Sequence, residues 1–290
     1  MARRNSLKQV LGSERPLVTP VAHDALSARM IERAGFKAFG IGGSSMLAAR
    51  HGIPDLGLAA LAEMVEGARA MAEATDLPFI MDGDDGYGDV KSVARMIGIY
   101  QGLGVGAVVL EDQIRDVKQP GNAQARSVVS VEAHCKKIAA AAGSRTDPEL
   151  LIVGRCDAHG LEGIDGAMRR CERYLKAGAD GVFVPGIRSE EELRRMASAF
   201  EGSYQIVDMV EGKPPWLTPT DLAEMGFTQV VYPAHVILRV TLAIEAALND
   251  LKSFAAGGPF AALPDPVAAR AVFEDAVREK HWQAIEQRFA

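Results

Sequence analysis

One pattern of apolar and polar positions recurs along the chain. A helix-like segment ends at a glycine, and a short apolar segment rich in β-branched and aromatic residues follows it. Glycine suits the residue just after a helix, where φ is positive, and the following residues favour a strand. The pattern occurs at 34–42, 103–112, 177–186 and 225–234. Further candidate strands lie at 17–22, 77–82, 150–155 and 204–210, which makes eight.

The segments between these strands are amphipathic, with apolar residues at helical spacing. Strict alternation of strand and helix predicts a parallel sheet, and eight such units predict a closed α/β (β/α)₈ TIM barrel over residues 1–250. The structural alternative is an open doubly wound sheet. That fold would favour a glycine-rich nucleotide loop after an early strand, and GIGGSS at 40–45 matches G-x-G-x-x-G poorly.

Residues 251–290 are predicted to form a linker and an additional C-terminal helical segment. SFAAGGPFAALPDP is punctuated by Gly and Pro, and the sequence from Pro266 to the C-terminus reads as a helix with an apolar stripe. That stripe must be buried somewhere. We expect it to cover the end of the barrel or to pack against another subunit.

Composition narrows the class of protein. Apolar residues make up 48% of the chain and charged residues 24%, which is typical of a globular domain. The net charge of −6 gives no reason to expect a nucleic-acid or membrane surface. No apolar run is long enough for a membrane span, and the early arginines are not followed by the apolar core of a secretory signal. Three cysteines without a CxxC pair favour the reducing cytoplasm.

Candidate chemistry is concentrated where the third strand ends. Asp82, Asp84 and Asp85 lie within LPFIMDGDDGYG, and three carboxylates so close together repel one another. Mg²⁺ would neutralise them, since it prefers oxygen ligands; Mn²⁺ is an alternative. A solvated acidic turn is the other interpretation, because Asp and Gly are ordinary turn residues.

The other strand ends favour the metal interpretation, because in a barrel the chemistry belongs at the carboxyl ends of the strands. Gly43, Ser44 and Ser45 offer backbone N–H groups suited to a carboxylate. The side chains predicted at the same rim are Glu111, Asp112, Arg155, Asp157, Glu211, Tyr232 and His235. So many charges at one rim have no packing rationale. Arg155 would bind an anionic substrate oxygen; its alternative role is an internal ion pair with Glu111 or Asp82.

These motifs together resemble the isocitrate lyase/phosphoenolpyruvate mutase superfamily over residues 15–250. The matching segments are AHDALSARMIERAGFKAF, GIPD, DGDDGYGD, LEDQ, GRCDA, MVEG and VYPAH. The resemblance implies a Mg²⁺-dependent barrel, commonly a homotetramer that exchanges C-terminal helices. It also implies small 2-oxo or 2-hydroxy carboxylate substrates, whose C–C or P–C bond breaks through an enolate.

Carried over position by position, the resemblance makes Asp55, Asp82, Asp84 and Glu111 the metal site. It makes Arg155 a ligand of the substrate carboxylate, with the backbone of 43–45 holding another carboxylate. Asp82, Glu211 and His235 complete the predicted substrate-binding set. Asp85 stands where the family usually has Thr, so the local charge is more negative than the pattern predicts.

The chain departs from the family in the loop at 115–127. The lyase branch carries a Lys-Lys/Arg-Cys-Gly-His motif whose Cys is taken as the catalytic acid or base. This chain has Pro120 where that Cys should be and Asn122 where the His should be. The lyases' Glu at the sixth strand end aligns with Pro185. The phosphonate branch has a Lys- and Asn-rich loop, which Lys118 and Asn122 match only loosely.

Loss of the proton-transferring Cys favours decarboxylation, which needs less acid–base chemistry than retro-aldol cleavage. Mg²⁺ bound to a 2-oxo acid acts as the electron sink. Oxaloacetate decarboxylase members resemble this chain in lacking the Cys and having a His after the last strand. We therefore expect a C–C lyase for a 2-oxo dicarboxylate such as oxaloacetate, with Arg155 and His235 catalytic; His235 as a packing residue is the alternative.

Three other functions stay open from the sequence. The first is a lyase of the 2-methylisocitrate or 2,3-dimethylmalate type. The second is an enzyme that acts on a P–C bond: a phosphonopyruvate hydrolase, a phosphoenolpyruvate mutase or a carboxyphosphonoenolpyruvate mutase. The third is a catalytically silent protein that binds the ligand without turning it over.

Overall fold

The computed structural model describes residues 6–119, 125–213 and 216–290. Eight parallel strands form a closed barrel in which each strand pairs with the next, and β8 pairs with β1. The strands are β1 (Leu17–Ala22), β2 (Phe39–Ile41), β3 (Phe79–Asp82), β4 (Ala107–Glu111), β5 (Leu151–Arg155), β6 (Gly181–Phe183), β7 (Tyr204–Asp208) and β8 (Gln229–Tyr232). The predicted TIM barrel is therefore confirmed, and the open sheet is excluded.

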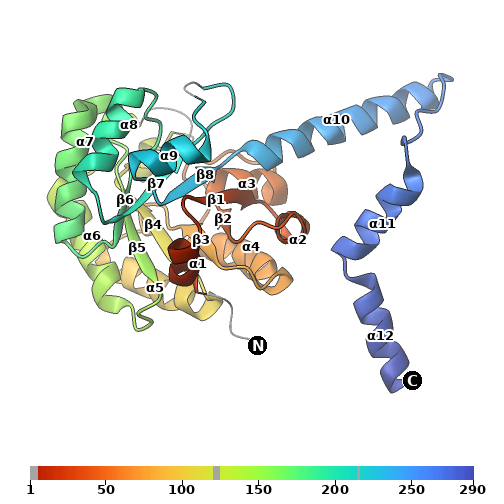
Figure 1. The fold of residues 1–290 in the computed structure, drawn as a ribbon, viewed down its shortest axis with the longest axis horizontal. Coiled ribbons are helices and arrows are strands. Elements are labelled where there is room, and N and C mark those ends of the chain that lie inside the picture. Colours follow the sequence, from red (N-terminus) through yellow and green to blue (C-terminus); the bar gives the residue numbers. More distant parts are fainter. Residues whose placement is uncertain (1–5, 120–124, 214–215) are drawn as a thin grey trace.

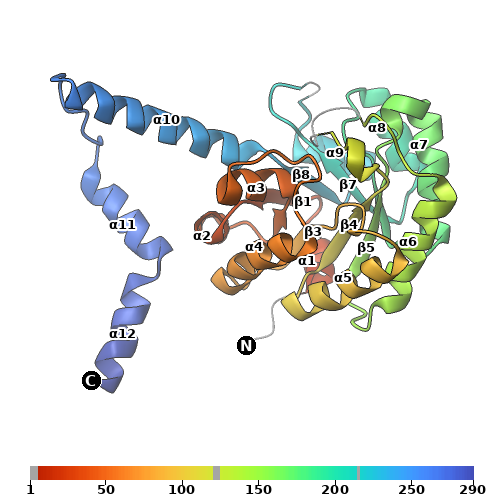
Figure 2. The same ribbon diagram turned by 180° about the vertical axis from the view of Figure 1, so that it is seen from behind.

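Helices surround the barrel, as Figures 1 and 2 show from opposite sides. They are α2 (Ala25–Arg33), α3 (Gly43–His51), α4 (Leu61–Ala74), α5 (Val90–Leu103), α6 (Val131–Ser144), α7 (His159–Lys176), α8 (Glu190–Ala199) and α9 (Pro219–Met225). The main apolar core lies between strands and helices and includes Phe39, Phe79, Met96 and Ile152. Alternate strand residues point to opposite faces, so each strand supplies one face to this core and the other to the barrel interior.

One end of the barrel is closed by a helix that the pattern did not predict. Helix α1 (Leu7–Ser13) begins with a capping box formed by Ser6 and Gln9. Its buried residues Leu7 and Val10 belong to the same apolar cluster as Leu17, Ala107 and Leu151 inside the barrel. With this end filled, the opposite end, at the carboxyl ends of the strands, is the one available for a ligand.

The C-terminal segment leaves the barrel as an arm. Helix α10 (His235–Ala255) starts beside β8 and extends outward, and α11 (Pro266–Ala276) and α12 (Glu279–Phe289) follow it (Figure 1). The predicted boundary at residue 250 falls within α10. The arm returns to the body where Arg33 binds Asp275 and Glu32 binds Arg278, at 2.8 and 3.1 Å.

The prediction of a single helix after residue 266 was wrong. Arg278 adopts φ +54°, in the left-handed region that interrupts an α-helix, and so separates α11 from α12. Among the described residues, no helix is both long and apolar enough to cross a membrane.

Candidate active site

Only some of the predicted rim residues meet at the open end of the barrel. A cavity of about 490 Å³ lies there, and Asp55, Asp82, Arg155 and Glu211 are among its lining residues. The backbone of 43–45 also lines it, because β2 ends directly at the N-terminus of α3. Gly42 caps that helix without a side-chain hydrogen bond, so the first N–H groups of α3 remain available to an anionic ligand.

The turn after β3 brings its acids into the site by an unusual backbone conformation. Asp84 has φ +45°, in the left-handed region, and its N–H donates to Asp82 Oδ1 at 2.9 Å. Its carbonyl accepts from Glu111 N at 2.9 Å, which ties the turn to the end of β4. The two strand ends that carry Asp84 and Glu111 are thus held together by backbone hydrogen bonds.

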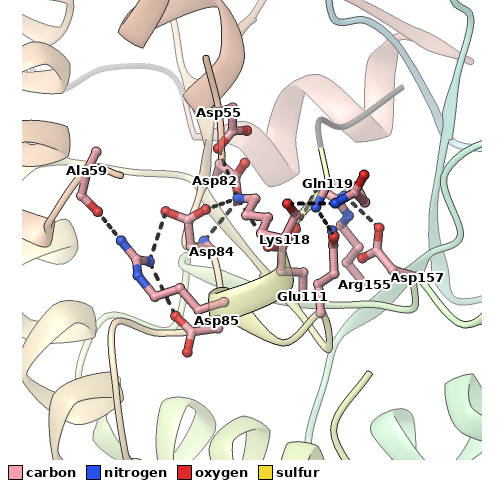
Figure 3. Close-up of polar contacts among 12 residues, drawn as sticks. Asp55, Ala59, Asp82, Asp84, Asp85, Glu111, Lys118, Gln119, Arg155 and Asp157 are labelled. Atoms are coloured by element: carbon pink, nitrogen blue, oxygen red, sulfur yellow. Dashed lines mark hydrogen bonds and ion pairs between the residues drawn. The ribbon is translucent and has the colours of Figure 1, made fainter. Parts of the chain in front are cut away.

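Three carboxylates converge on one ammonium group (Figure 3). Lys118 Nζ lies 3.1 Å from Asp55 Oδ1 and 3.1 Å from Glu111 Oε1, and it also pairs with Asp84 Oδ1. Glu111 uses its other oxygen for Arg155, whose Nη1 is 3.1 Å from Oε2. Arg155 Nη2 also binds Asp157 Oδ1 at 2.7 Å. The ion pair of Arg155 with Glu111, considered as its alternative role, is therefore present.

Burial is the main influence on the titration of the acids in this site. Burial raises the pKa of Glu111 to about 8, although Arg155 and Lys118 act in the opposite direction. Burial and the neighbouring Asp84 carboxylate raise the pKa of Asp82 to about 6. Burial alone would lower the pKa of Lys118, but the surrounding carboxylates, Glu111 foremost, raise it above its usual value. Both acids thus gain from additional positive charge nearby.

The fit of these residues to a divalent cation can be judged from their donors. As they stand, the described residues contain no group of three Asp, Glu, His or Cys side chains that could hold a metal ion. The ammonium of Lys118 lies between Asp55, Asp84 and Glu111 instead. Carboxylate oxygens that already converge on a cation are nevertheless the donors that Mg²⁺ prefers, so the residues fit the metal chemically.

Asp85 is directed away from this group. Its carboxylate binds Lys137 Nζ at 3.2 Å and lies 3.6 Å from Arg115 Nη1. The extra negative charge that the sequence places beside the metal motif is thus paired with Lys137 and with Arg115, and Arg115 Nη1 also lies 3.8 Å from Asp84 Oδ2.

Glu211 and His235 lie together at the mouth of the cavity. Glu211 accepts from Arg239 Nη2 at 2.7 Å, and this hydrogen bond lowers the pKa of Glu211. His235 Nδ1 is 3.4 Å from Glu211 Oε2, and the His235 side chain is 48% exposed. Glu211 lines the cavity, whereas His235 is not among its lining residues. His235 begins α10, where the packing alternative placed it.

The role of Lys118 was missed by sequence reasoning. Lys118 follows the short 3₁₀ turn η1 (Arg115–Val117), in a segment without hydrophobic periodicity. In the sequence, the only indication of this role was the presence of one lysine near the divergent loop. Pro120 and Asn122, which carry the comparison with the family loop, lie outside the described residues.

Comparison with known proteins identifies the relatives of this barrel. The family model described as phosphoenolpyruvate phosphomutase matches residues 7–252. The chain belongs to the isocitrate lyase/phosphoenolpyruvate mutase superfamily. The chain is 36% identical to 2,3-dimethylmalate lyase of Eubacterium barkeri over 248 residues, which is 85% of each chain. It is 33% identical to the petal death protein of Dianthus caryophyllus, over 99% of this chain and 89% of that one.

Solved structures agree with this superfamily assignment. Oxaloacetate acetylhydrolase in complex with 3,3-difluorooxalacetate superimposes with a TM-score of 0.89 at 27% identity, covering 98% of this chain and 96% of that one. Phosphonopyruvate hydrolase in complex with oxalate and Mg²⁺ gives a TM-score of 0.83 at 26% identity, covering 100% and 99%. The superfamily predicted from the sequence motifs is confirmed.

Proposed function

We propose that this protein is a Mg²⁺-dependent carbon–carbon lyase that decarboxylates a small 2-oxo dicarboxylate such as oxaloacetate. One observation carries the proposal. Asp55 and Asp82, the Arg155 guanidinium and the N-terminus of α3 all line one cavity at the open end of the barrel. A cation-binding acid cluster beside two anion-binding groups suits a dicarboxylate that also chelates a metal.

The proposal assigns metal binding to four acids and substrate binding to Arg155 and the backbone of 43–45. Asp55, Asp82, Asp84 and Glu111 would hold the divalent cation, with Mn²⁺ as an alternative to Mg²⁺. When bound, that cation supplies an electron sink for bond cleavage. Arg155 binds one substrate carboxylate, and Glu111 and Asp157 fix the orientation of its guanidinium. The N–H groups of 43–45 bind the other carboxylate.

His235 and Glu211 are proposed to act at the mouth of the cavity. Glu211 lines the cavity and is held by Arg239, so it is positioned to orient a bound ligand. Through its pairing with Glu211, His235 would influence the keto end of the substrate.

The apolar wall of the cavity supports a dicarboxylate over a tricarboxylate. Pro185 lines the cavity at the sixth strand end, where the family lyases place a Glu. Nearby Asp208 is already paired with Arg188 at 2.9 Å. The identity to 2,3-dimethylmalate lyase makes cleavage of an alkyl-substituted malate the second candidate function.

A substrate panel with the purified protein tests the proposal. We expect pyruvate release from oxaloacetate with Mg²⁺, well above the background from metal alone. EDTA should abolish the activity, and excess Mg²⁺ should restore it. Arg155→Gln and Asp84→Asn should each lower kcat/KM by about 100-fold or more. Asp116→Asn is the matched control, since Asp116 is exposed on η1 of the same segment.

Each other result points to a different function. Cleavage of 2,3-dimethylmalate or 2-methylisocitrate without oxaloacetate turnover would favour the lyase alternative. Phosphate release from phosphonopyruvate, or its isomerisation, would assign P–C chemistry. Mg²⁺-dependent binding of oxalate with no turnover on the panel would favour a silent binding protein. Turnover that persists in EDTA would overturn the metal dependence.

We also propose a cytoplasmic homo-oligomer, a tetramer, in which the arm packs on a neighbouring subunit. Leu242, Leu248 and Leu251 of α10 are each about 60% exposed, and so is Trp282 of α12. An apolar face of this length is normally buried by another chain. The three cysteines are free, in keeping with a reducing compartment.

A further inference from the structure

The ammonium of Lys118 occupies the centre of the acid cluster. Its side chain is 2% exposed, and its nitrogen contacts Asp55, Asp84 and Glu111 (Figure 3). An ammonium group has three N–H donors, and each of these carboxylates can accept one of them. A buried charge is stable only when it is paired this completely.

The backbone around Lys118 is built to hold it there. Lys118 N donates to Arg115 O at 3.2 Å, and Gln119 N donates to Gln113 Oε1 at 2.6 Å. The Arg115 guanidinium binds Ala59 O. A Cβ at Gly57 would lie 2.9 Å from Arg115 O, so the two loops are in close contact. The turn that carries Lys118 is thus docked against residues 57–59.

We infer that Lys118 is a resident counter-ion that competes with the divalent cation for the same three carboxylates. This inference rests on the metal dependence proposed above. Mg²⁺ needs its ligand oxygens at about 2.0–2.1 Å in octahedral geometry, and no space remains for an ammonium among them. Metal binding therefore requires the Lys118 side chain to leave the cluster. The divalent charge compensates the acids better than the single charge it replaces.

Competition of this kind lowers the apparent affinity for the metal. Only molecules in which Lys118 has withdrawn can bind Mg²⁺, so the apparent Kd rises by the inverse of their fraction. In return, Lys118 compensates the buried carboxylates of Asp55, Asp84 and Glu111 in the metal-free protein, of which Glu111 also pairs with Arg155. Lys118 thus stabilises the empty site and weakens its metal binding.

Calorimetric titration of MgCl₂ into the metal-free, full-length protein tests the inference. Lys118→Met keeps the aliphatic stem and removes the charge, so we expect it to bind Mg²⁺ at least tenfold more tightly than the wild type. Lys137→Met is the matched control. Lys137 binds Asp85 outside the cluster, and its loss should change the Kd by less than twofold. Lys118→Arg retains the charge and should stay closer to the wild type than Lys118→Met.

Lysine acylation of the wild type, read by mass spectrometry, gives a second measurement that needs no variant. Lys118 should be protected without metal and react in saturating Mg²⁺. Lys91, whose side chain is 86% exposed, should react equally in both states. This measurement keeps the inference testable if Lys118→Met does not fold without metal.

Specific outcomes contradict the inference. Equal or weaker Mg²⁺ binding by Lys118→Met, or protection of Lys118 in saturating Mg²⁺, would overturn it and leave the proposed metal dependence intact. Absence of Mg²⁺ binding in both the wild type and Lys118→Met would overturn the metal dependence itself, and the inference with it.

Discussion

At the residue scale, His134 on α6 shows how burial changes a titration. Its side chain is fully buried, and its ring packs edge-on against Tyr174 with a centroid distance of 4.6 Å. Burial, with a smaller contribution from the positive charge of Lys137, lowers the pKa of His134 from 6.5 to about 3. Between these two pKa values, the unfolded chain therefore binds a proton at His134 that the folded protein does not bind.

This difference predicts the sign of a pH effect. Because the unfolded state binds more protons between pH 3 and 6.5, stability falls as the pH drops through that range. His134 should make the free energy of unfolding about 2 kcal/mol lower at pH 5 than at pH 7. His134→Gln should remove this contribution, as measured by urea unfolding at both pH values. His281→Gln, at an exposed position on α12, is the control and should keep the wild-type pH dependence. If His134→Gln also keeps it, His134 is not the source of the pH effect.

Individual residues differed in how far the sequence could place them. Asp82, Asp84 and Glu111 were predicted because they end strands, and strand ends of a barrel share one rim. Asp112, next to Glu111, faces the helices instead: its carboxylate accepts from Tyr174 OH at 2.6 Å and Arg170 Nη1 at 3.2 Å. Lys118 could not be predicted, because its position depends on a turn docking against a loop some 60 residues earlier.

At the element scale, β6 begins with a glycine that the barrel requires. Gly181 pairs with Tyr204 of β7, and a Cβ at Gly181 would overlap the Tyr204 carbonyl oxygen. The Tyr204 backbone cannot move aside, as the end of a flexible side chain could. No other residue type fits at this start of the strand without shifting the β6–β7 pairing.

Gly181→Ala should therefore lower the free energy of unfolding by about 3 kcal/mol, because of overpacking against a strand. Gly98→Ala is the matched control: Gly98 lies within α5, with open space around its Cβ position. It should raise stability by about 0.5–1 kcal/mol. Denaturant unfolding of both variants checks this, and equal effects would contradict the packing argument.

Elements that repeat were predicted, and elements that occur once were not. All eight strands were recognised: four follow the repeated helix–glycine–strand pattern, and the other four are short apolar segments that alternate with amphipathic ones. Helix α1 is short, so its apolar residues were too few to reveal a helical period in the sequence. The break between α11 and α12 occurs at Arg278, a residue type that does not mark a helix end in the sequence.

At the scale of the whole molecule, the arm makes a prediction about assembly. The purified protein should elute as a homo-oligomer in size-exclusion chromatography with light scattering. Leu242→Glu together with Leu248→Glu should shift it to smaller species, since both side chains are about 60% exposed and would be buried in a subunit contact. Glu245→Lys, on the same helix, is a control for a change of charge alone. A monomeric wild type would contradict the prediction.

Helix α10 belongs to two parts of the molecule at once. Ile237, Leu238 and Thr241, from its first two turns, line the cavity, and the remaining turns form the arm. A hydrogen-bonded α-helix of 21 residues transmits displacement along its axis as a stiff rod. In an oligomer built through this arm, as proposed above, a reorientation of neighbouring protomers would therefore tilt one wall of the cavity and change its width.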